Sequence, residues 1–451
     1  MPIPQSDRGR RIYDDDRRYV FHSWSAQAGL DPLVITDAEG VRVEDADGRS
    51  YLDFSSQLVY TNLGHRHPAV VEAIRRQAAE LATIAPAHAN EARSQAARLI
   101  IERAPASMEK VFFTNGGAEA VENAIRMARL YTGRYKVLSQ YRSYHGSTAM
   151  AINTTGDHRR WANDYGTSGA VHFFGPFLYR SVFHARDEKE ECERALAHLE
   201  QVIAFEGPQA FAAIVLETVP GTAGVMPPPA GYLRGVRELC DRYGIVLVLD
   251  EVMVGFGRTG TWFASEHYDV EPDLMTFAKG VNSGYVPLGG VLLNGPVAHF
   301  FDDRPYPGGM TYSGHPLACA AAVATIRTMA EEDVPRQAAD LGRQVLGPGL
   351  AELAQRHPSI GEVRGLGAFW ALDLVSDRET REPIAPYGGS SEAVTRTLAA
   401  GREAGLLLFN QYHRIHLAPP LTMSAEDARE GLRLLDGVLD VTDAYTTAAR
   451  V

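Results

Sequence analysis

Short apolar runs separated by helical segments fill the middle of this chain and restrict the folds open to it. The runs are KVFFT (110–114), YKVLS (135–139), FAAIVLE (211–217), GIVLVLDE (244–251), DLMTFAK (273–279) and LGGVLLN (288–294). Apolar runs without polar alternation are typical of strands that are buried on both faces. Helical segments between such strands favour a parallel sheet. We therefore predict an α/β fold with a mostly parallel sheet.

The two ends of the chain have a different pattern of polar and apolar residues. Residues 1 to about 20 are polar and predict an arm, and short β-like runs over 33–54 predict an antiparallel meander. After about residue 320, an alanine-rich helix, two β-like segments (361–375 and 414–421) and a final helix predict an α+β region. We predict an N-terminal arm and part of a small domain (1–65), a large domain (66–325) and the C-terminal small domain (326–451).

Composition excludes several classes of protein. The 451 residues include 44 Lys and Arg against 56 Asp and Glu, and the net charge of -12 argues against nucleic-acid binding. Cys192, Cys240 and Cys319 are too widely spaced for a disulfide framework or a zinc ribbon, which favours a reducing compartment. The polar N-terminus is unlike a signal peptide, and no apolar run approaches a membrane span. We expect a cytoplasmic protein that binds neither nucleic acid nor membrane.

Two charged residues stand at the ends of predicted strands. Asp250 ends GIVLVLD and Lys279 ends DLMTFAK, 29 residues later. Ligands of open α/β sheets bind beyond the carboxyl ends of the strands. Each residue alone is more often a solvated strand boundary, so the prediction of a site depends on what accompanies them.

Three glycine-containing segments could accompany them in a ligand site. In TNGGAEAVENAIRMAR (114–129), a strand end, Gly116, Gly117 and an amphipathic helix form the kind of turn that binds a phosphate. SYHGST (143–148) places Tyr144, which could stack on a flat ring, beside His145. GGMTYSGHP (308–316) is a glycine-rich loop that offers the Thr311 hydroxyl. None of these segments is specific by itself.

Two other patterns have weaker interpretations. GFGRTG (255–260) fits the dinucleotide fingerprint G-x-G-x-x-G, but no clean amphipathic helix follows it, and no acidic residue ends a second strand. A nicotinamide oxidoreductase therefore remains only an alternative. GHRHP (64–68) lacks a third metal ligand and predicts a turn, so we predict no metal site.

Taken together, these segments resemble the class III pyridoxal-phosphate-dependent aminotransferases, or omega-aminotransferases. The matching segments, in the family's order, are TNGGAEAVENAIRMAR, YHGST, DEVMVGFGRTG (250–260), PDLMTFAKG (272–280), TYSGHP (311–316) and HLAPPL (416–421). The resemblance extends from about Leu30 to the last helix. It implies fold type I, in which a large domain has a mostly parallel, seven-stranded sheet and a small α+β domain is built from both termini.

The resemblance also implies a cofactor, pyridoxal 5'-phosphate, and a role for each matching residue. Lys279 would hold the cofactor as a Schiff base and then act as general acid and base, with a pKa lowered by burial. Asp250 would bond the pyridine nitrogen and keep it protonated. The remaining cofactor contacts would be Gly116, Gly117 and Ala118 at the phosphate, Val252 and Tyr144 on the two ring faces, His145 beside Tyr144, Glu217 near the cofactor hydroxyl, and Thr311 from the neighbouring subunit. The resemblance thus implies a homodimer with shared active sites, and leaves open whether dimers pair into tetramers.

Departures from the family pattern concern the substrate. Many members have a glutamine where this chain has Met253, and amino-acid-specific members have an arginine at His416 and its glutamate partner at Thr222. Arg414, on the same face of an extended strand, could substitute for that arginine. A mobile arginine of some members would fall near Phe409. We predict a pocket tolerant of amines without a carboxylate, with apolar wall candidates Trp24, Leu58, Val59 and Tyr60.

The sequence therefore predicts an enzyme that transfers an amino group from a primary amine or ω-amino acid to a keto acid in two half-reactions. Pyruvate is the expected acceptor. A transaminase for taurine or another ω-amino acid with 2-oxoglutarate is the alternative, because several segments resemble taurine-specific members. An aminomutase or decarboxylase on the same scaffold is a further alternative.

Overall fold

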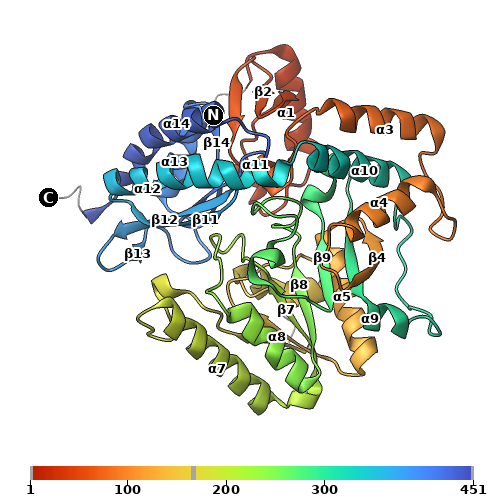
Figure 1. Cartoon of the computed structure of the whole chain (residues 1–451). Coiled ribbons are helices and arrows are strands. Elements are labelled where there is room, and N and C mark those ends of the chain that lie inside the picture. The colour runs from red at the N-terminus through yellow and green to blue at the C-terminus, as the bar shows by residue number, and fades with distance from the viewer. Residues whose placement is uncertain (1–3, 164–168, 448–451) are drawn as a thin grey trace.

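The structure is a computed structural model of the chain and describes residues 4–163 and 169–447. Figure 1 shows that the first and last parts of the chain lie side by side, while the middle of the chain forms the larger, lower part of the molecule. In the described residues, no helix is long and apolar enough to cross a membrane.

A seven-stranded sheet lies at the centre of the larger part. Its strand order is β4-β10-β9-β8-β7-β5-β6, with parallel pairing from β9 through β6, and β10 is antiparallel to both of its neighbours. The mostly parallel sheet predicted from the sequence is therefore confirmed. The strands are β4 (Met108–Thr114), β5 (Lys136–Gln140), β6 (Ala170–Phe173), β7 (Phe211–Glu217), β8 (Val246–Asp250), β9 (Leu274–Phe277) and β10 (Gly289–Asn294).

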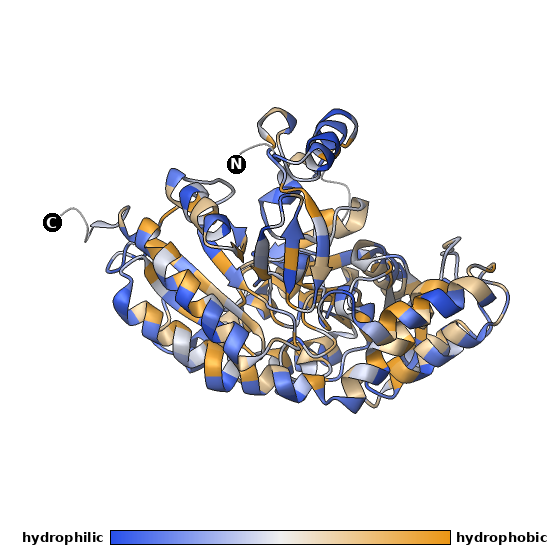
Figure 2. Cartoon of the chain, turned by 90° about the horizontal axis from the view of Figure 1, so that it is seen from above, coloured by the Kyte–Doolittle hydropathy of each residue, from blue (hydrophilic) through white to orange (hydrophobic). Residues whose placement is uncertain are grey.

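Helices cover both faces of this sheet, which explains why its strands are continuously apolar. In β7, Ala213 and Val215 belong to the core cluster that contains α5 (Gly117–Thr132), whereas Ile214 and Leu216 belong to the cluster of α7 and α8. Successive side chains of a strand point to opposite faces, so both sets must be apolar. Figure 2 shows the hydrophobic sides of the helices turned inward. The two helices on the second face are α7 (Glu188–Glu206) and α8 (Tyr232–Tyr243).

The strands at the β4 edge pack against a third group of helices. Phe113 of β4, Phe277 of β9 and Leu292 of β10 share one core cluster with these helices and with much of the C-terminal region. The predicted alanine-rich helix is one of them. The helices are α3 (Pro68–Glu80), α4 (Glu91–Ile101) and α10 (Pro316–Glu331); the short helices α6 (Ala149–Thr154) and α9 (Gly295–Phe300) complete the large part.

The N-terminal region forms a helix and a small sheet. The predicted polar arm contains a helix, α1 (Asp7–Tyr19), which is stabilised at its start because the Ser6 side chain accepts a hydrogen bond from the Gly9 N–H. The predicted meander is confirmed as an antiparallel sheet. Its last strand also pairs in parallel with β14 (Leu406–Leu407), so one sheet joins both ends of the chain. The N-terminal strands are β1 (Ile35–Glu39), β2 (Arg42–Asp45) and β3 (Ser50–Asp53).

The C-terminal region contains a second antiparallel sheet with helices. Its strand order is β11-β12-β16-β15, and β13 pairs with β12. The strands are β11 (Ile360–Leu366), β12 (Phe369–Asp377), β13 (Glu382–Pro383), β15 (Phe409–Gln411) and β16 (Arg414–Leu417). The helices are α11 (Val334–Leu341), α12 (Gly347–Arg356), α13 (Glu392–Glu403) and α14 (Ala425–Asp443).

Candidate active site

A cavity of about 760 Å³ lies beyond the carboxyl ends of β7 and β8, where segments from both ends of the chain meet the large sheet. Most of the residues singled out from the sequence line it, although they are spread from the N-terminal region to residue 279. They are Trp24, Leu58, Tyr60, Gly116, Gly117, Ala118, Tyr144, His145, Glu217, Thr222, Asp250, Val252 and Lys279. Met253 and Phe409 line the same cavity.

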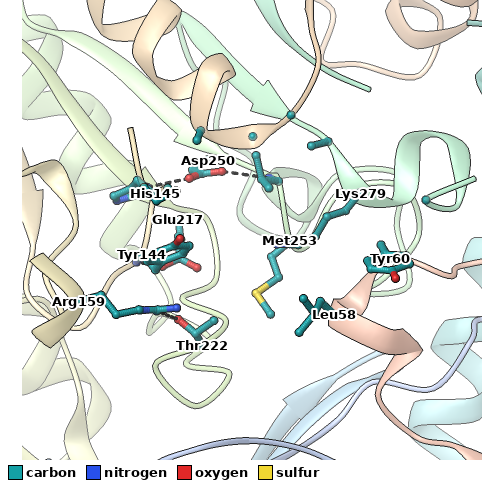
Figure 3. Close-up of a pocket in the computed structure, with 18 of the residues that line it drawn as sticks. Leu58, Tyr60, Tyr144, His145, Arg159, Glu217, Thr222, Asp250, Met253 and Lys279 are labelled. Carbon is teal, nitrogen blue, oxygen red and sulfur yellow. Dashed lines mark hydrogen bonds and ion pairs between the residues drawn. The ribbon is translucent and has the colours of Figure 1, made fainter. Parts of the chain in front are cut away.

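Asp250 is a buried, hydrogen-bonded carboxyl group in the wall of this cavity. Its Oδ2 lies 2.7 Å from Nδ1 of His145, and its Oδ1 accepts hydrogen bonds from the Thr276 hydroxyl (3.0 Å) and the Val252 N–H (3.0 Å). Burial lowers the pKa of His145, but the hydrogen bond and charge of Asp250 outweigh it and raise that pKa overall. The Asp250 side chain therefore favours the charged form of the imidazole. Figure 3 shows this pair on one wall of the pocket.

Lys279 follows β9 and begins a short helical turn at Lys279–Asn282. Its φ is +48°, a left-handed conformation that costs a long side chain energy and therefore needs support from its surroundings. Burial lowers the pKa of Lys279, against the opposing charges of Asp250 and Glu217. A lysine with a lowered pKa is a better nucleophile and base near neutral pH than an exposed one.

The N-terminus of α5 is open toward the cavity. This helix of 16 residues begins at Gly117 without a side-chain cap, so N–H groups of its first turn point out of the helix end unpaired within it. A Cβ on Gly117 would lie 2.7 Å from Cγ1 of Val252, so glycine lets the helix start approach the segment after β8 this closely. The predicted phosphate turn therefore has the backbone geometry of an anion site.

Glu217 connects two neighbouring segments of the cavity wall. Its Oε1 accepts the N–H of Tyr144 at 2.9 Å, and its Oε2 accepts the N–H of Gly221 at 2.8 Å. Burial raises the pKa of Glu217 to about 7. Its two oxygens thus determine where the Tyr144 ring and the loop after β7 stand.

Arg159 is a pocket residue that the sequence analysis missed. It belongs to a short helical segment, His158–Asn163, and lines the cavity with His158. Its Cζ lies 3.6 Å from the centre of the Tyr144 ring, and its Nη2 donates to the Thr222 hydroxyl at 3.1 Å. Figure 3 shows Arg159 and Lys279 on different sides of the pocket. The pair Arg159-Arg160 was the available signal, but it does not tell which arginine points inward.

Comparison with known proteins identifies the family of this chain. The family model described as aminotransferase class-III matches residues 25–439. The chain belongs to the class III aminotransferases. The resemblance proposed from the sequence motifs is confirmed, and so is fold type I.

Relatives of this class III aminotransferase include enzymes of known substrate. It is 36% identical to the taurine–pyruvate aminotransferase of Rhodobacter capsulatus, over 85% of this chain and 86% of that protein. The taurine:2-oxoglutarate aminotransferase of Bifidobacterium kashiwanohense, solved with PLP and glutamate, has a TM-score of 0.93 and 43% identity, covering 96% of this chain and 98% of that one. A PLP-bound amine transaminase from an uncultivated Pseudomonas species has a TM-score of 0.89 and 36% identity, covering 94% and 98%.

Class III aminotransferases use pyridoxal phosphate, and the cavity of this member contains the groups that such a cofactor needs. An amine with a lowered pKa, a buried carboxylate backed by an imidazole, and an open helix N-terminus line one space. They suit the carbonyl, the pyridine nitrogen and the phosphate of the cofactor respectively. The residues present therefore fit the group.

Four predicted residues of this aminotransferase do not line the cavity. Val59 is 1% exposed and packs in a core cluster, and Arg414 is buried beside Asp373. His416 is fully buried behind the loop that follows β7. All four residues of β16 are buried, so neither Arg414 nor His416 reaches the pocket. Thr311 is exposed outside the cavity of its own chain, so its assignment to a neighbouring subunit stays a prediction.

The GFGRTG segment of the aminotransferase forms a buried structural loop. Phe256, Gly257 and Gly260 adopt positive φ values, and no helix begins there. The fully buried Arg258 donates hydrogen bonds to the carbonyls of Ala368 and Pro419 and to the side chains of Ser56 and Asn62. This segment therefore joins the N-terminal and C-terminal regions to the large sheet. The alternative of a nicotinamide oxidoreductase is wrong, because the motif holds no helix N-terminus open to a ligand.

Proposed function

We propose that this aminotransferase acts on primary amines that bear a distal anionic group, such as the ω-amino sulfonate taurine or an ω-amino carboxylate, and uses a keto acid as acceptor. The observation that supports this proposal is the position of Arg159 on the cavity wall, away from Lys279. The names of two relatives, a taurine–pyruvate and a taurine:2-oxoglutarate aminotransferase, agree with such a donor.

The orientation of Arg159 favours an anionic ligand. Asp157 holds one edge of the guanidinium, with Nε within 2.9 Å of Oδ2, and Thr222 accepts from Nη2. Within the described residues, Nη1 has no hydrogen-bond acceptor. A guanidinium held in this way can donate to a sulfonate or carboxylate without first reorganising. Tyr144 beneath it stabilises the cation further.

In the proposed roles for the cofactor end, Lys279 binds the cofactor covalently and Asp250 accepts a hydrogen bond from its ring nitrogen. When bound, pyridoxal phosphate supplies an electron sink for the carbon from which the proton is lost. The Lys279 amine would act as the general base that takes the proton from the substrate carbon next to nitrogen, and as the general acid that gives it back. Its lowered pKa leaves more of the amine neutral and able to accept that proton.

The other cofactor contacts are proposed from their places around the cavity. Tyr144 and Val252 would hold the two ring faces, with His145 behind Asp250. Gly116, Gly117 and Ala118 supply backbone N–H groups to the phosphate. Glu217 orients Tyr144 and the loop after β7 through its two backbone hydrogen bonds. Trp24, Leu58 and Tyr60 form the apolar wall between the ring and the solvent, where Trp24 is 68% exposed.

We expect Arg159→Gln to raise KM for taurine and β-alanine by about tenfold to a hundredfold, because the anion loses one charged hydrogen bond. KM for n-butylamine, which has no distal anion, should change little. Steady-state kinetics on the three donors, each with pyruvate and with 2-oxoglutarate, measure the effect and also identify the acceptor.

The neighbouring arginine provides the matched control for that experiment. Arg160 lies in the same short helical segment but does not line the cavity, so Arg160→Gln should leave the preference for anionic donors unchanged. The proposal is wrong if the wild-type enzyme prefers n-butylamine over taurine and β-alanine, or if Arg159→Gln affects all donors alike.

We also propose a homodimer in which the Thr311 hydroxyl reaches the cofactor phosphate of the neighbouring subunit. Thr311→Asp and Lys279→Ala should then each be inactive, but a refolded equal mixture should regain about a quarter of wild-type activity, since half of the dimers would hold one intact site. Light scattering on each variant checks that it remains a dimer. Full activity of Thr311→Asp alone, or no recovery on mixing, would contradict the shared site.

A further inference from the structure

The buried ring of His416 holds the loop that follows β7. Its Nε2 lies 3.1 Å from the carbonyl oxygen of Gly221. Burial lowers the pKa of His416 to about 3, so the ring is neutral and has a single N–H. Because a carbonyl only accepts hydrogen bonds, that proton is on Nε2. The Phe409 ring, which lines the cavity, lies against the His416 ring at 4.9 Å between centres and keeps it in place.

Gly221 is therefore held from both sides of its backbone. Its N–H donates to Oε2 of Glu217 at 2.8 Å, while its carbonyl accepts from His416. A Cβ at this position would lie 2.3 Å from Sδ of Met253 and 3.3 Å from Cζ of Phe369, so the space around Gly221 is closely filled. The Gly221 residue thus has little freedom to shift, and it fixes the start of the next residue, Thr222.

Thr222 links the fixed Gly221 backbone to Arg159 on the cavity wall. Its hydroxyl accepts from Nη2 of Arg159 at 3.1 Å, and the Arg159 guanidinium lies over the ring of Tyr144. The N–H of Tyr144 donates a hydrogen bond to Oε1 of Glu217 at 2.9 Å. These contacts form a closed ring of five residues, part of which is visible in Figure 3. The residues are Glu217, Tyr144, Arg159, Thr222 and Gly221. His416 contacts this ring of residues at Gly221, from outside the cavity.

We infer that His416 is a positioning residue that sets the enzyme's preference for anionic donors, by fixing Gly221 and Thr222 so that Thr222 holds Arg159 toward the substrate. This inference rests on the proposed function, in which Arg159 binds the distal anion. His416 itself does not touch the substrate, because the loop and Phe409 separate it from the cavity. It contributes a hydrogen bond rather than a charge.

A pair of matched substitutions tests the hydrogen bond apart from the shape of the side chain. Gln can place an N–H near the position of Nε2, and Met has similar length but no donor. We expect His416→Met to raise KM for taurine roughly threefold to tenfold, the effect of one lost hydrogen bond. His416→Gln should remain near wild type, and turnover of n-butylamine should be similar in all three proteins. Equal taurine KM values in the Gln and Met variants, or an equal loss with both donors, would overturn the inference.

A double-mutant cycle supplies a second, independent measurement. Thr222→Val removes the acceptor for Arg159 but keeps the side-chain shape, and it should also raise KM for taurine. If His416 acts through Thr222, the combined effect of His416→Met and Thr222→Val is smaller than the product of the single effects. Independent, multiplying effects would overturn the inference.

The two hypotheses fail in different ways. If Arg159→Gln leaves KM for taurine unchanged, the proposed function is wrong. If Arg159→Gln raises that KM but His416→Met does not, Arg159 still binds the anion, and only the positioning role of His416 is wrong.

Discussion

Replacing Lys279 with alanine should reduce turnover by about 10⁴-fold or more, since in the proposed mechanism Lys279 supplies both the covalent attachment and the group that moves the proton. The cofactor should remain bound only through its phosphate and ring contacts. Stopped-flow absorbance on mixing with taurine measures the first half-reaction directly. Borohydride reduction and peptide mapping of the wild-type protein should attach the cofactor to Lys279.

The chain provides a convenient control for that experiment, because it has only four lysines. Lys189 is exposed on α7, pairs with Glu193 and does not line the cavity. Lys189→Ala should therefore bind cofactor and turn over like the wild type. Turnover retained by Lys279→Ala, or a label on another lysine, would refute the assignment.

Replacing Asp250 with asparagine should lower the rate of the half-reaction by roughly 10²- to 10³-fold, the effect of removing one charge from a buried pair. Asparagine keeps the shape of the side chain, so cofactor affinity should fall much less than the rate. The reason is that three donors, from His145, Thr276 and Val252, now face a neutral amide instead of a carboxylate. Single-turnover absorbance gives the rate, and equilibrium dialysis gives cofactor affinity.

Asp273 is a suitable comparison for Asp250. It lies just before β9, and it accepts hydrogen bonds from Arg237, Asn294 and the Leu247 N–H outside the cavity. Asp273→Asn should lower the melting temperature but leave the half-reaction rate near wild type. If Asp250→Asn and Asp273→Asn had the same kinetic effect, Asp250 would have only a structural role.

The sequence predicted the fold well because its strands are local and strongly apolar. Six of the seven strands in the large sheet begin and end within two residues of their predicted runs, for example β7 at 211–217. It missed β6, whose short segment AVHF is interrupted by a histidine, and it predicted an arm where α1 forms. In α1 the helix depends on the Ser6 cap and on contacts with residues about 40 positions away, which a local pattern does not contain.

In the candidate site, the residues at the cofactor end were predicted better than those of the substrate pocket. Asp250, Lys279 and the Gly116-Gly117 turn follow directly from strand ends, and all of them line the cavity. For the substrate pocket the sequence was less informative. Val59 was predicted in the apolar wall and Arg414 as a possible carboxylate-binding residue, but both lie in the core. Arg159 was overlooked.

The sequence by itself determined the fold class, the family and the groups that suit a cofactor, because each of these depends on short segments in which neighbouring residues act together. The tertiary structure decided which side chains meet at the substrate end. Arg159 contacts Thr222 across 63 residues, and His416 contacts Gly221 across 195. Such contacts depend on how the loop after β7 packs between the large sheet and β16, and no spacing in the chain encodes that packing.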